Sequence, residues 1–380
     1  MKIDVYQEAL NLHKDHGGKL ETVSKLKLDN KEVLSLAYSP GVAEVSRVIS
    51  KDPGTANIYT LKKNTVAVIS DGSSILGLGN LGALAAIPVM EGKAAIFKEF
   101  AGVDAFPICL DTQDTEEIIK TIKLIAPVFG GINLEDIAAP KCFEIEERLR
   151  SELDIPVMHD DQWGAATVTL AGVINSLKLR GTEKNDARVA LSGLGAAGVA
   201  TARLLIEYGI TNIVFVDSRG IVHSGRTDLN KEKVELIAKS SAESKSGTLT
   251  DAVAGCNIFI GLSKPGVLSR EMVSTMAERP IIFALANPTP EIMPEIAKEA
   301  GVFIIGTGRS DYPNQINNSL VFPGLFKGML ARGGQFDNSI FVGVAQALAA
   351  HVKDPRPEYI LPDMFDKQVV DIVYQYVQSH

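Results

Sequence analysis

Cysteine and tryptophan are scarce in this sequence of 380 residues, which has three cysteines and one tryptophan. The spacings between Cys109, Cys142 and Cys256 are 33 and 114 residues, which match neither a zinc motif nor a disulfide framework. We therefore expect all three to be reduced residues that serve in packing, as in a cytoplasmic protein.

An excess of positive charge is also missing. The formal net charge is −8, and lysines and arginines are scattered, so we expect no nucleic-acid partner and no membrane partner. No stretch without charge reaches membrane-spanning length, and residues 1–18 lack the apolar core of a signal peptide. G-x-S-x-G and Walker A motifs are absent, which leaves hydrolase and kinase functions without support. We expect a cytoplasmic globular protein.

Short apolar runs are present instead, and they alternate with helical patterns from residue 65 onward. Strands that are apolar throughout and separated by helices are typical of parallel sheets covered on both faces. The pattern predicts an α/β fold. The predicted strands are 65–70, 105–110, 127–133, 155–159, 188–193, 212–217, 257–263, 281–287 and 302–308.

The length of the chain predicts two domains, because a single core rarely grows beyond about 250–300 residues. Residues 165–180 form a long apolar helical pattern, and a fresh βαβ unit starts after the polar residues that follow it. We place the boundary near 160, with a mainly parallel sheet in each part. The predicted domains are 1–160, a catalytic and metal-binding domain, and 161–380, a Rossmann-type dinucleotide-binding domain with C-terminal helices.

The glycine-rich stretch "GLGAAG" at 193–198 follows a predicted strand and opens a predicted helix at 196–208. Asp217 ends the next strand, 24 residues after Gly193, close to the spacing of about 20 in dinucleotide-binding folds. We expect Asp217 to hold the adenosine ribose, and Arg219 could neutralise a 2′-phosphate, so NAD is favoured and NADP is possible. The predicted cofactor-binding residues of the loop are Gly193, Gly195, Ala196, Ala197 and Gly198.

A second stretch of this kind, "GLGNLG" at 77–82, lacks that context. The nearest following acid at a strand end is Asp111, 34 residues after Gly77. We interpret the stretch as a loop that allows close backbone approach, not as a second dinucleotide site.

Two pairs of acids follow two of the predicted strands, Glu135 with Asp136 and Asp160 with Asp161. The carboxyl ends of parallel strands are where open α/β sheets place their ligands. Gathered carboxylates repel one another, and a divalent cation removes that cost. Oxygen ligands favour Mg²⁺ or Mn²⁺, whereas the alternative is that each pair only caps a helix. A metal beside a dinucleotide indicates oxidation of a chelated hydroxyl group, and the candidate bases are Lys93, Lys98, Tyr38 and His159.

Several longer motifs follow one another over about residues 10–330. They are "AYSPGVAEV", "DGSSILGLGNLG", "PVMEGKAAIFKEFAG", "INLEDI", "HDDQWGAA", "LSGLGAAG", "ALANPTPE" and "GRSDYPNQINNSLVFPG". Together they resemble the short-form malic enzyme family. The resemblance implies oxidative decarboxylation of L-malate to pyruvate and CO₂, with NAD or NADP, with Mg²⁺ or Mn²⁺, and in at least a dimer.

By this resemblance, Glu135, Asp136 and Asp161 match the metal ligands of the family, and Asp160 lies just behind them as an acidic neighbour. The resemblance thus implies the same metal site that the acid pairs suggested.

Tyr38 matches the general acid that protonates the enol, and Lys93 matches the general base on the C2 hydroxyl, a substrate-binding position. Asn287 and Asn318 match asparagines that contact cofactor and substrate carboxylate, with Asn317 close by. A base near neutral pH needs a lowered lysine pKa, which a cation favours and carboxylates oppose. Our hypothesis is that the metal outweighs Asp160.

The sequence departs from the family at three positions. Trp163 and Ala165 replace a histidine and a threonine, and Ser74 stands where longer members carry an arginine. The departure in "HDDQWGAA" leaves open decarboxylation of oxaloacetate without net hydride transfer. A second alternative is a non-catalytic dinucleotide sensor whose acids only cap helices.

Overall fold

The protein folds around two sheets, seen in a computed structural model that describes residues 4–242 and 246–380. The first sheet is entirely parallel, with the strand order β2-β1-β3-β4. Its strands are fully or mostly apolar, as expected for a sheet covered on both faces. They are β1 (Thr65–Ser70), β2 (Asp104–Cys109), β3 (Gly131–Leu134) and β4 (Val157–His159).

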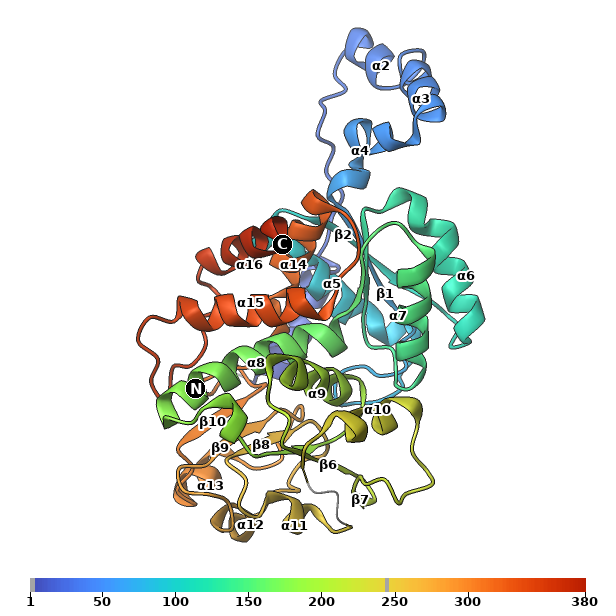
Figure 1. The fold of residues 1–380 in the computed structure, drawn as a ribbon. Helices are drawn as coiled ribbons and strands as arrows, with labels where there is room; N and C mark the ends of the chain where they lie inside the picture. The colour runs from blue at the N-terminus through green and yellow to red at the C-terminus, as the bar shows by residue number, and fades with distance from the viewer. Residues whose placement is uncertain (1–3, 243–245) are drawn as a thin grey trace.

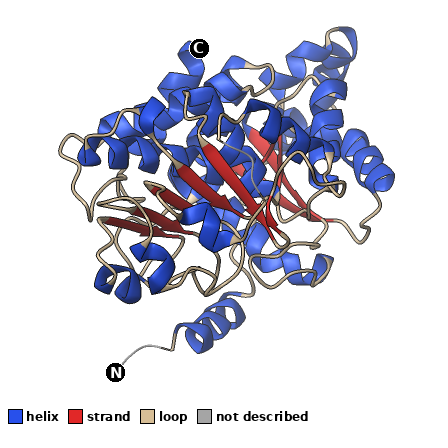
Figure 2. Cartoon of the chain, turned by 60° about the horizontal axis from the view of Figure 1, so that its bottom comes forward, coloured by secondary structure: helices blue, strands red, loops and turns tan. Residues whose placement is uncertain are grey.

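The second sheet has the order β10-β9-β8-β5-β6-β7, and only β7 runs antiparallel to its neighbour. The five parallel strands form a Rossmann-type sheet, with helices on either side of it (Figures 1 and 2). The strands are β5 (Val189–Ser192), β6 (Ile213–Asp217), β7 (Gly220–Ile221), β8 (Ile258–Gly261), β9 (Ile281–Ala284) and β10 (Ile304–Thr307).

The helices bring distant parts of the chain together. The C-terminal helices α14 and α16 pack on each other, and α14 also contacts α5 of the first half (Figure 1). The α-helices are α1 (Val5–His16), α2 (Lys31–Ala37), α3 (Val42–Lys51), α4 (Ala56–Tyr59), α5 (Ala83–Ala101), α6 (Thr115–Ile125), α7 (Lys141–Glu152), α8 (Asp160–Arg180), α9 (Ala196–Tyr208), α10 (Lys231–Lys239), α11 (Leu249–Val253), α12 (Arg270–Ser274), α13 (Pro294–Glu299), α14 (Phe322–Arg332), α15 (Asn338–His351) and α16 (Gln368–Ser379).

An N-terminal arm, which we define as α2 to α4, projects beyond the rest of the chain at the top of Figure 1. Its apolar side chains are exposed, including Leu36, Tyr38 and Ile58. A group of exposed apolar side chains is typical of a surface that another protein covers.

The structure confirms the α/β class and all nine predicted strands, and it moves several boundaries. The predicted strand 127–133 is β3, shifted because Ala126–Val128 form a 3₁₀ helix. The helix predicted at 165–180 begins at Asp160, so the acids form its first turn rather than preceding it. Sequence reasoning missed β7. The domain boundary near 160 stays a prediction; it lies where β4 meets α8.

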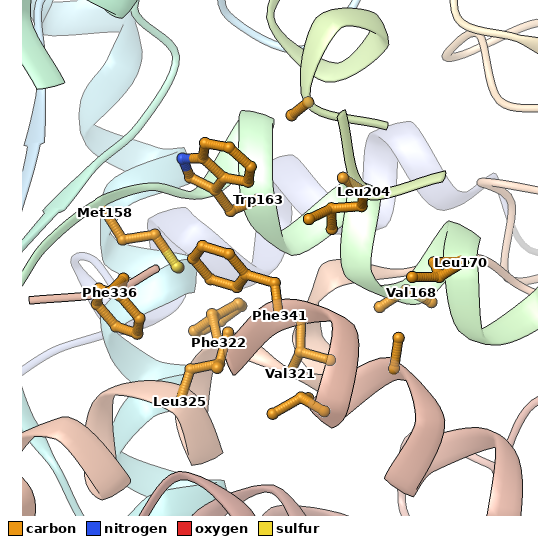
Figure 3. Close-up of a cluster of buried hydrophobic side chains, with 14 of the residues drawn as sticks. Met158, Trp163, Val168, Leu170, Leu204, Val321, Phe322, Leu325, Phe336 and Phe341 are labelled. Carbon is orange, nitrogen blue, oxygen red and sulfur yellow. The ribbon is translucent and has the colours of Figure 1, made fainter. Parts of the chain in front are cut away.

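A continuous apolar core joins the two halves. Figure 3 shows Met158 and Trp163 from the β4–α8 region beside Phe322, Phe336 and Phe341 from the C-terminal third. All three cysteines are unpaired, as predicted. Among the described residues, none of the helices combines the length and the apolar character that a membrane crossing needs.

Candidate functional site

The two acid pairs meet at the carboxyl edge of the first sheet. Strands β3 and β4 are neighbours, with Leu134 opposite His159, so the residues that follow them emerge side by side. Oxygens of Glu135, Asp136 and Asp161 all lie within 4.8 Å of one another. Only folding brings these three carboxylates within reach of a single ion.

Burial and mutual repulsion disfavour ionisation of these acids. Burial raises the pKa of Glu135 to about 7, an effect that Lys93 opposes. Burial, with the charges of Asp161 and Glu135, raises the pKa of Asp136 to about 8. One oxygen of Asp136, Oδ2, is buried without a hydrogen-bond partner. Hard oxygen ligands, clustered and partly unpaired, fit a divalent cation such as Mg²⁺ or Mn²⁺.

Lys93 lies among the same acids. It projects from α5, is buried, pairs with Asp160, and places Nζ 2.6 Å from Oε1 of Glu135. The Phe322 ring covers the ammonium at 4.4 Å. Burial by itself lowers the pKa of Lys93, but Asp160, Glu135 and Asp161 outweigh burial and raise it. Without a cation, therefore, Lys93 is a charged partner of the acids and not a base.

Asp160 does not belong to the three-carboxylate group and has partners of its own. Besides Lys93, it accepts a hydrogen bond of 2.6 Å from Nδ2 of Asn318. A side chain at Gly164 would come within 1.9 Å of Oδ1 of Asp160, so glycine is needed one turn further along α8. Asp160 thus holds Lys93 and Asn318 together.

The other candidate bases fall elsewhere. Lys98 is exposed and pairs with Asp104 at 2.7 Å. His159 is fully buried, and burial lowers its pKa to about 4, which leaves its ring neutral near pH 7. Tyr38 is 70% exposed on the N-terminal arm. Figure 1 shows this arm well apart from α5, so one chain does not bring Tyr38 to Lys93.

The glycine loop of the second sheet has the geometry that its pattern requires. Gly193 has φ of 102°, and Gly195 is the N-cap of α9. A Cβ at Gly198 would lie 1.8 Å from the carbonyl oxygen of Gly193, whereas a Cβ at Gly195 would meet nothing within 4 Å. Gly198 therefore permits close packing of helix on strand, and Gly195, followed by Ala196 and Ala197, leaves the helix N-terminus accessible to a pyrophosphate.

Asp217 ends β6, where a dinucleotide ribose is expected, but its carboxylate is already engaged. Arg226 donates to both oxygens, at 2.8 and 3.0 Å, and Lys233 donates to Oδ2 at 2.6 Å. Although partial burial acts in the opposite direction, these cations hold the pKa of Asp217 well below its usual range. Arg219, the residue proposed to meet a 2′-phosphate, pairs with Asp228 at 2.9 Å.

The carboxyl edges of the two sheets face each other. A Cβ at Gly77 would lie 1.7 Å from the carbonyl oxygen of Asn287, so the loop after β1 touches the loop after β9. This contact agrees with the prediction that the "GLGNLG" stretch allows close backbone approach. Asn317 does not contact the acids; its Oδ1 accepts a hydrogen bond from the amide of Ser319.

Sequence reasoning missed three charged residues, namely Arg226, Lys233 and Glu146. Arg226 lies in an irregular segment that has no periodic pattern, and Lys233 lies in α10, directly after that segment. Glu146 carried a signal, because it stands on the apolar face of its helix with Cys142 and Leu149, where an acid is unusual.

Comparison with known proteins agrees with this architecture, which defines a dinucleotide-binding α/β protein. The model of the malic enzyme N-terminal domain matches residues 17–150, and that of the malic enzyme NAD binding domain matches residues 163–375. The chain belongs to the malic enzyme family.

Two relatives and one solved structure show how close the similarity is. The chain is 51% identical to the bifunctional malic/malolactic enzyme of Bacillus subtilis, over 97% of this chain and 90% of that protein. It is 52% identical to the NAD-dependent malic enzyme of Geobacillus stearothermophilus, over 95% of this chain and 76% of that protein. The crystal structure of the NAD-dependent malic enzyme from Thermotoga maritima superposes with a TM-score of 0.95 at 46% identity, covering 97% of this chain and 98% of that one.

Proposed function

We propose that this protein catalyses the metal-dependent oxidative decarboxylation of L-malate to pyruvate and CO₂, with reduction of NAD or NADP. The observation that carries the proposal is the cluster of Glu135, Asp136 and Asp161 with Lys93 beside it. This cluster lies at the sheet edge that faces the dinucleotide-binding half. Acids that only cap helices, as in a dinucleotide sensor, need no buried lysine among them.

Glu135, Asp136 and Asp161 would hold the divalent cation, and the 193–198 loop would hold the dinucleotide. When bound, the cation supplies Lewis-acid chemistry and the nicotinamide accepts a hydride. Asn287 and Asn318 would orient the substrate and nicotinamide from the second half of the chain, with Asn317 nearby. Of these, Asn318 is supported by its contact with Asp160.

Lys93 is the proposed general base on the C2 hydroxyl. It can accept a proton only when the neighbouring carboxylates are neutralised, because their charges are what raise its pKa against the effect of burial. A cation held by Glu135, Asp136 and Asp161 would offset the charges of Glu135 and Asp161. Asp160 remains to orient the lysine, and our hypothesis is that its single charge is not enough to keep Lys93 protonated.

Tyr38 is the proposed general acid that delivers a proton to C3. Because the arm carries Tyr38 away from Lys93 of the same chain, we propose a homodimer in which the arm reaches the site of the partner subunit. The exposed apolar side chains of the arm support this proposal, since a partner would bury them. We also propose a cytoplasmic location, which the unpaired cysteines support.

Steady-state kinetics test the proposed function. Malate with Mn²⁺ should reduce NAD or NADP, release CO₂ and form pyruvate, and EDTA should abolish all three. CO₂ release from oxaloacetate with none from malate would instead indicate a decarboxylase without net redox. Tight NAD binding with the same affinity in the presence and absence of EDTA, and without turnover, would indicate a sensor. Lactate should be measured beside pyruvate, because the Bacillus subtilis relative is named for both activities.

A further inference from the structure

Glu146 is a buried acid outside the three-acid cluster. It lies on α7, is 4% exposed, and shares the inner face of the helix with apolar side chains. Among the described residues, no lysine or arginine approaches its carboxylate within 4 Å to form an ion pair. A buried carboxylate without a cation needs several hydrogen-bond donors to offset its desolvation.

Within residues 4–242 and 246–380, the side-chain carboxylate of Glu146 accepts hydrogen bonds from one short segment, residues 159–163. The amide of His159 donates to Oε1 at 3.0 Å, and Nε2 of Gln162 donates to Oε2 at 3.0 Å. Nε1 of Trp163 donates to both oxygens, at 2.8 and 3.0 Å. Because every partner is an N–H group, both oxygens must act as acceptors, which an ionised carboxylate does best.

The same segment carries the proposed metal ligand Asp161. It forms the end of β4 and the first turn of α8, and Oδ2 of Asp161 accepts a 2.7 Å hydrogen bond from the amide of Asp136. Glu146 is therefore bonded to the residues on both sides of Asp161 in the sequence. A shift of the turn by a few tenths of an ångström would move Asp161 relative to Glu135 and Asp136.

Trp163 is held on its other side as well. Its ring stacks on Phe341 at 4.9 Å with an angle of 3°, and Phe341 stacks on Phe336 at 5.5 Å. Figure 3 shows this stack within the apolar core. The apolar ring of Trp163 thus packs on Phe341 while its N–H group donates to Glu146. This tryptophan stands where the family pattern has a histidine.

We propose that Glu146 is a positioning residue of the metal site. By accepting hydrogen bonds from His159, Gln162 and Trp163, it holds the first turn of α8 so that Asp161 can share a cation with Glu135 and Asp136. The inference rests on the proposed function, since it assumes that those acids bind a metal. Glu146 would act on the cation only through Asp161, not as a ligand.

Direct measurement of Mn²⁺ binding tests this role. Electron paramagnetic resonance reports free Mn²⁺ and therefore gives the dissociation constant without turnover. Glu146→Gln replaces one acceptor oxygen with an amide donor, and we expect it to weaken Mn²⁺ binding about 10- to 100-fold, as is usual for residues that orient metal ligands. Its affinity for NAD should change less than about threefold.

Glu291→Gln is the matched control. Glu291 is also fully buried, and it accepts hydrogen bonds from the amides of Ser263 and Ala286 in the dinucleotide-binding half, at 2.8 and 3.0 Å. The same chemical change there should weaken NAD binding and leave the Mn²⁺ affinity unchanged. A general loss of stability would instead affect both ligands in both variants.

A second pair of variants covers the case in which Glu146→Gln does not fold. Trp163→Phe keeps the stack on Phe341 and removes one donor, so Mn²⁺ binding should weaken severalfold, and Trp163→His should restore most of it. Trp163 is the sole tryptophan of the chain, so in the parent its fluorescence provides a second record of Mn²⁺ binding.

The outcomes separate the two proposals. Parent-like Mn²⁺ affinity in Glu146→Gln, or in Trp163→Phe where Glu146→Gln is not folded, overturns the positioning role alone. Absence of Mn²⁺ binding by the parent protein overturns the metal site and the inference with it.

Discussion

Asn318 and Asp160 are joined by a hydrogen bond of 2.6 Å, from Nδ2 to Oδ2, across 158 residues of sequence. The bond ties the segment after β10 to the first turn of α8, and Asp160 in turn pairs with Lys93. One carboxylate thus links Asn318 of the second half to Lys93 of the first.

Asp136→Asn should stabilise the metal-free protein at alkaline pH. The pKa of Asp136 is raised to about 8 in the folded state, against about 3.9 for an unperturbed aspartate. An acid whose pKa is raised in the folded state makes its full contribution to stability at pH values below its unfolded pKa. That contribution is lost as the pH rises through the folded pKa. The melting temperature of the metal-free parent should therefore fall between pH 6 and pH 9, and less so in the variant.

Adding Mn²⁺ should reverse the order of stability of the parent and Asp136→Asn. At a Mn²⁺ concentration of about 100 times the dissociation constant, the unfolding free energy of the parent should rise by about 2.7 kcal/mol. The unfolding free energy of Asp136→Asn should rise little when Mn²⁺ is added. Scanning calorimetry with EDTA or Mn²⁺ measures both effects, and equal metal stabilisation of parent and variant would remove Asp136 from the ligand set.

Asp217→Ser should shift the cofactor preference toward NADP. Arg226 and Lys233 are paired with Asp217 in the parent, and its removal frees both cations to meet a 2′-phosphate. Charge-assisted hydrogen bonds contribute about 1.5–3 kcal/mol each, so we expect the kcat/KM ratio of NADP to NAD to rise at least about tenfold. Glu235→Gln, which removes a carboxylate that pairs with Arg203 and Lys239 instead, is the control and should change the ratio far less.

Alanine at two positions of the glycine loop should have opposite effects on folding and binding. Gly195→Ala places Cβ in open space, so the melting temperature should hold while NAD affinity falls about tenfold or more. Gly198→Ala drives Cβ against the carbonyl of Gly193 and should cost about 1–3 kcal/mol of stability. Thermal unfolding and calorimetric NAD titration distinguish the two variants. A loss of stability in both variants would mean that neither glycine serves mainly to admit the cofactor.

Mixed dimers should reveal which subunit supplies Tyr38. Tyr38→Phe and Lys93→Ala should each lose most activity as homodimers. When the two chains are expressed together, half of the dimers are mixed, and each mixed dimer has one intact site if Tyr38 acts on the partner. About a quarter of parent activity should then return, whereas a tyrosine acting within its own chain returns none. Lys63→Ala, at an exposed lysine, is the control: mixed with the Tyr38→Phe chain it should give about half of parent activity whichever subunit supplies Tyr38.

Much of the fold follows from local pattern. Apolar runs separated by helical periodicity specify parallel strands covered on both faces, and nine of them were predictable because each run must be buried somewhere. The 193–198 loop was predictable for the same local reason, since glycine is needed where backbone must turn or approach closely. The acids after β3 and β4 could be assigned to one edge because parallel strands end together.

Contacts between distant segments were decided only by tertiary structure. The sequence places Asp217 at a strand end, but packing alone determines that Arg226 and Lys233 occupy its carboxylate. Likewise, the early start of α8 and the separation of Tyr38 from Lys93 carry no local signature. The position of Glu146 on an apolar helix face marks it as unusual, but only folding shows that its partners are in the first turn of α8. The physical reason is that a charged side chain takes its partner from whichever donors folding brings within about 3 Å, and sequence spacing does not encode that distance.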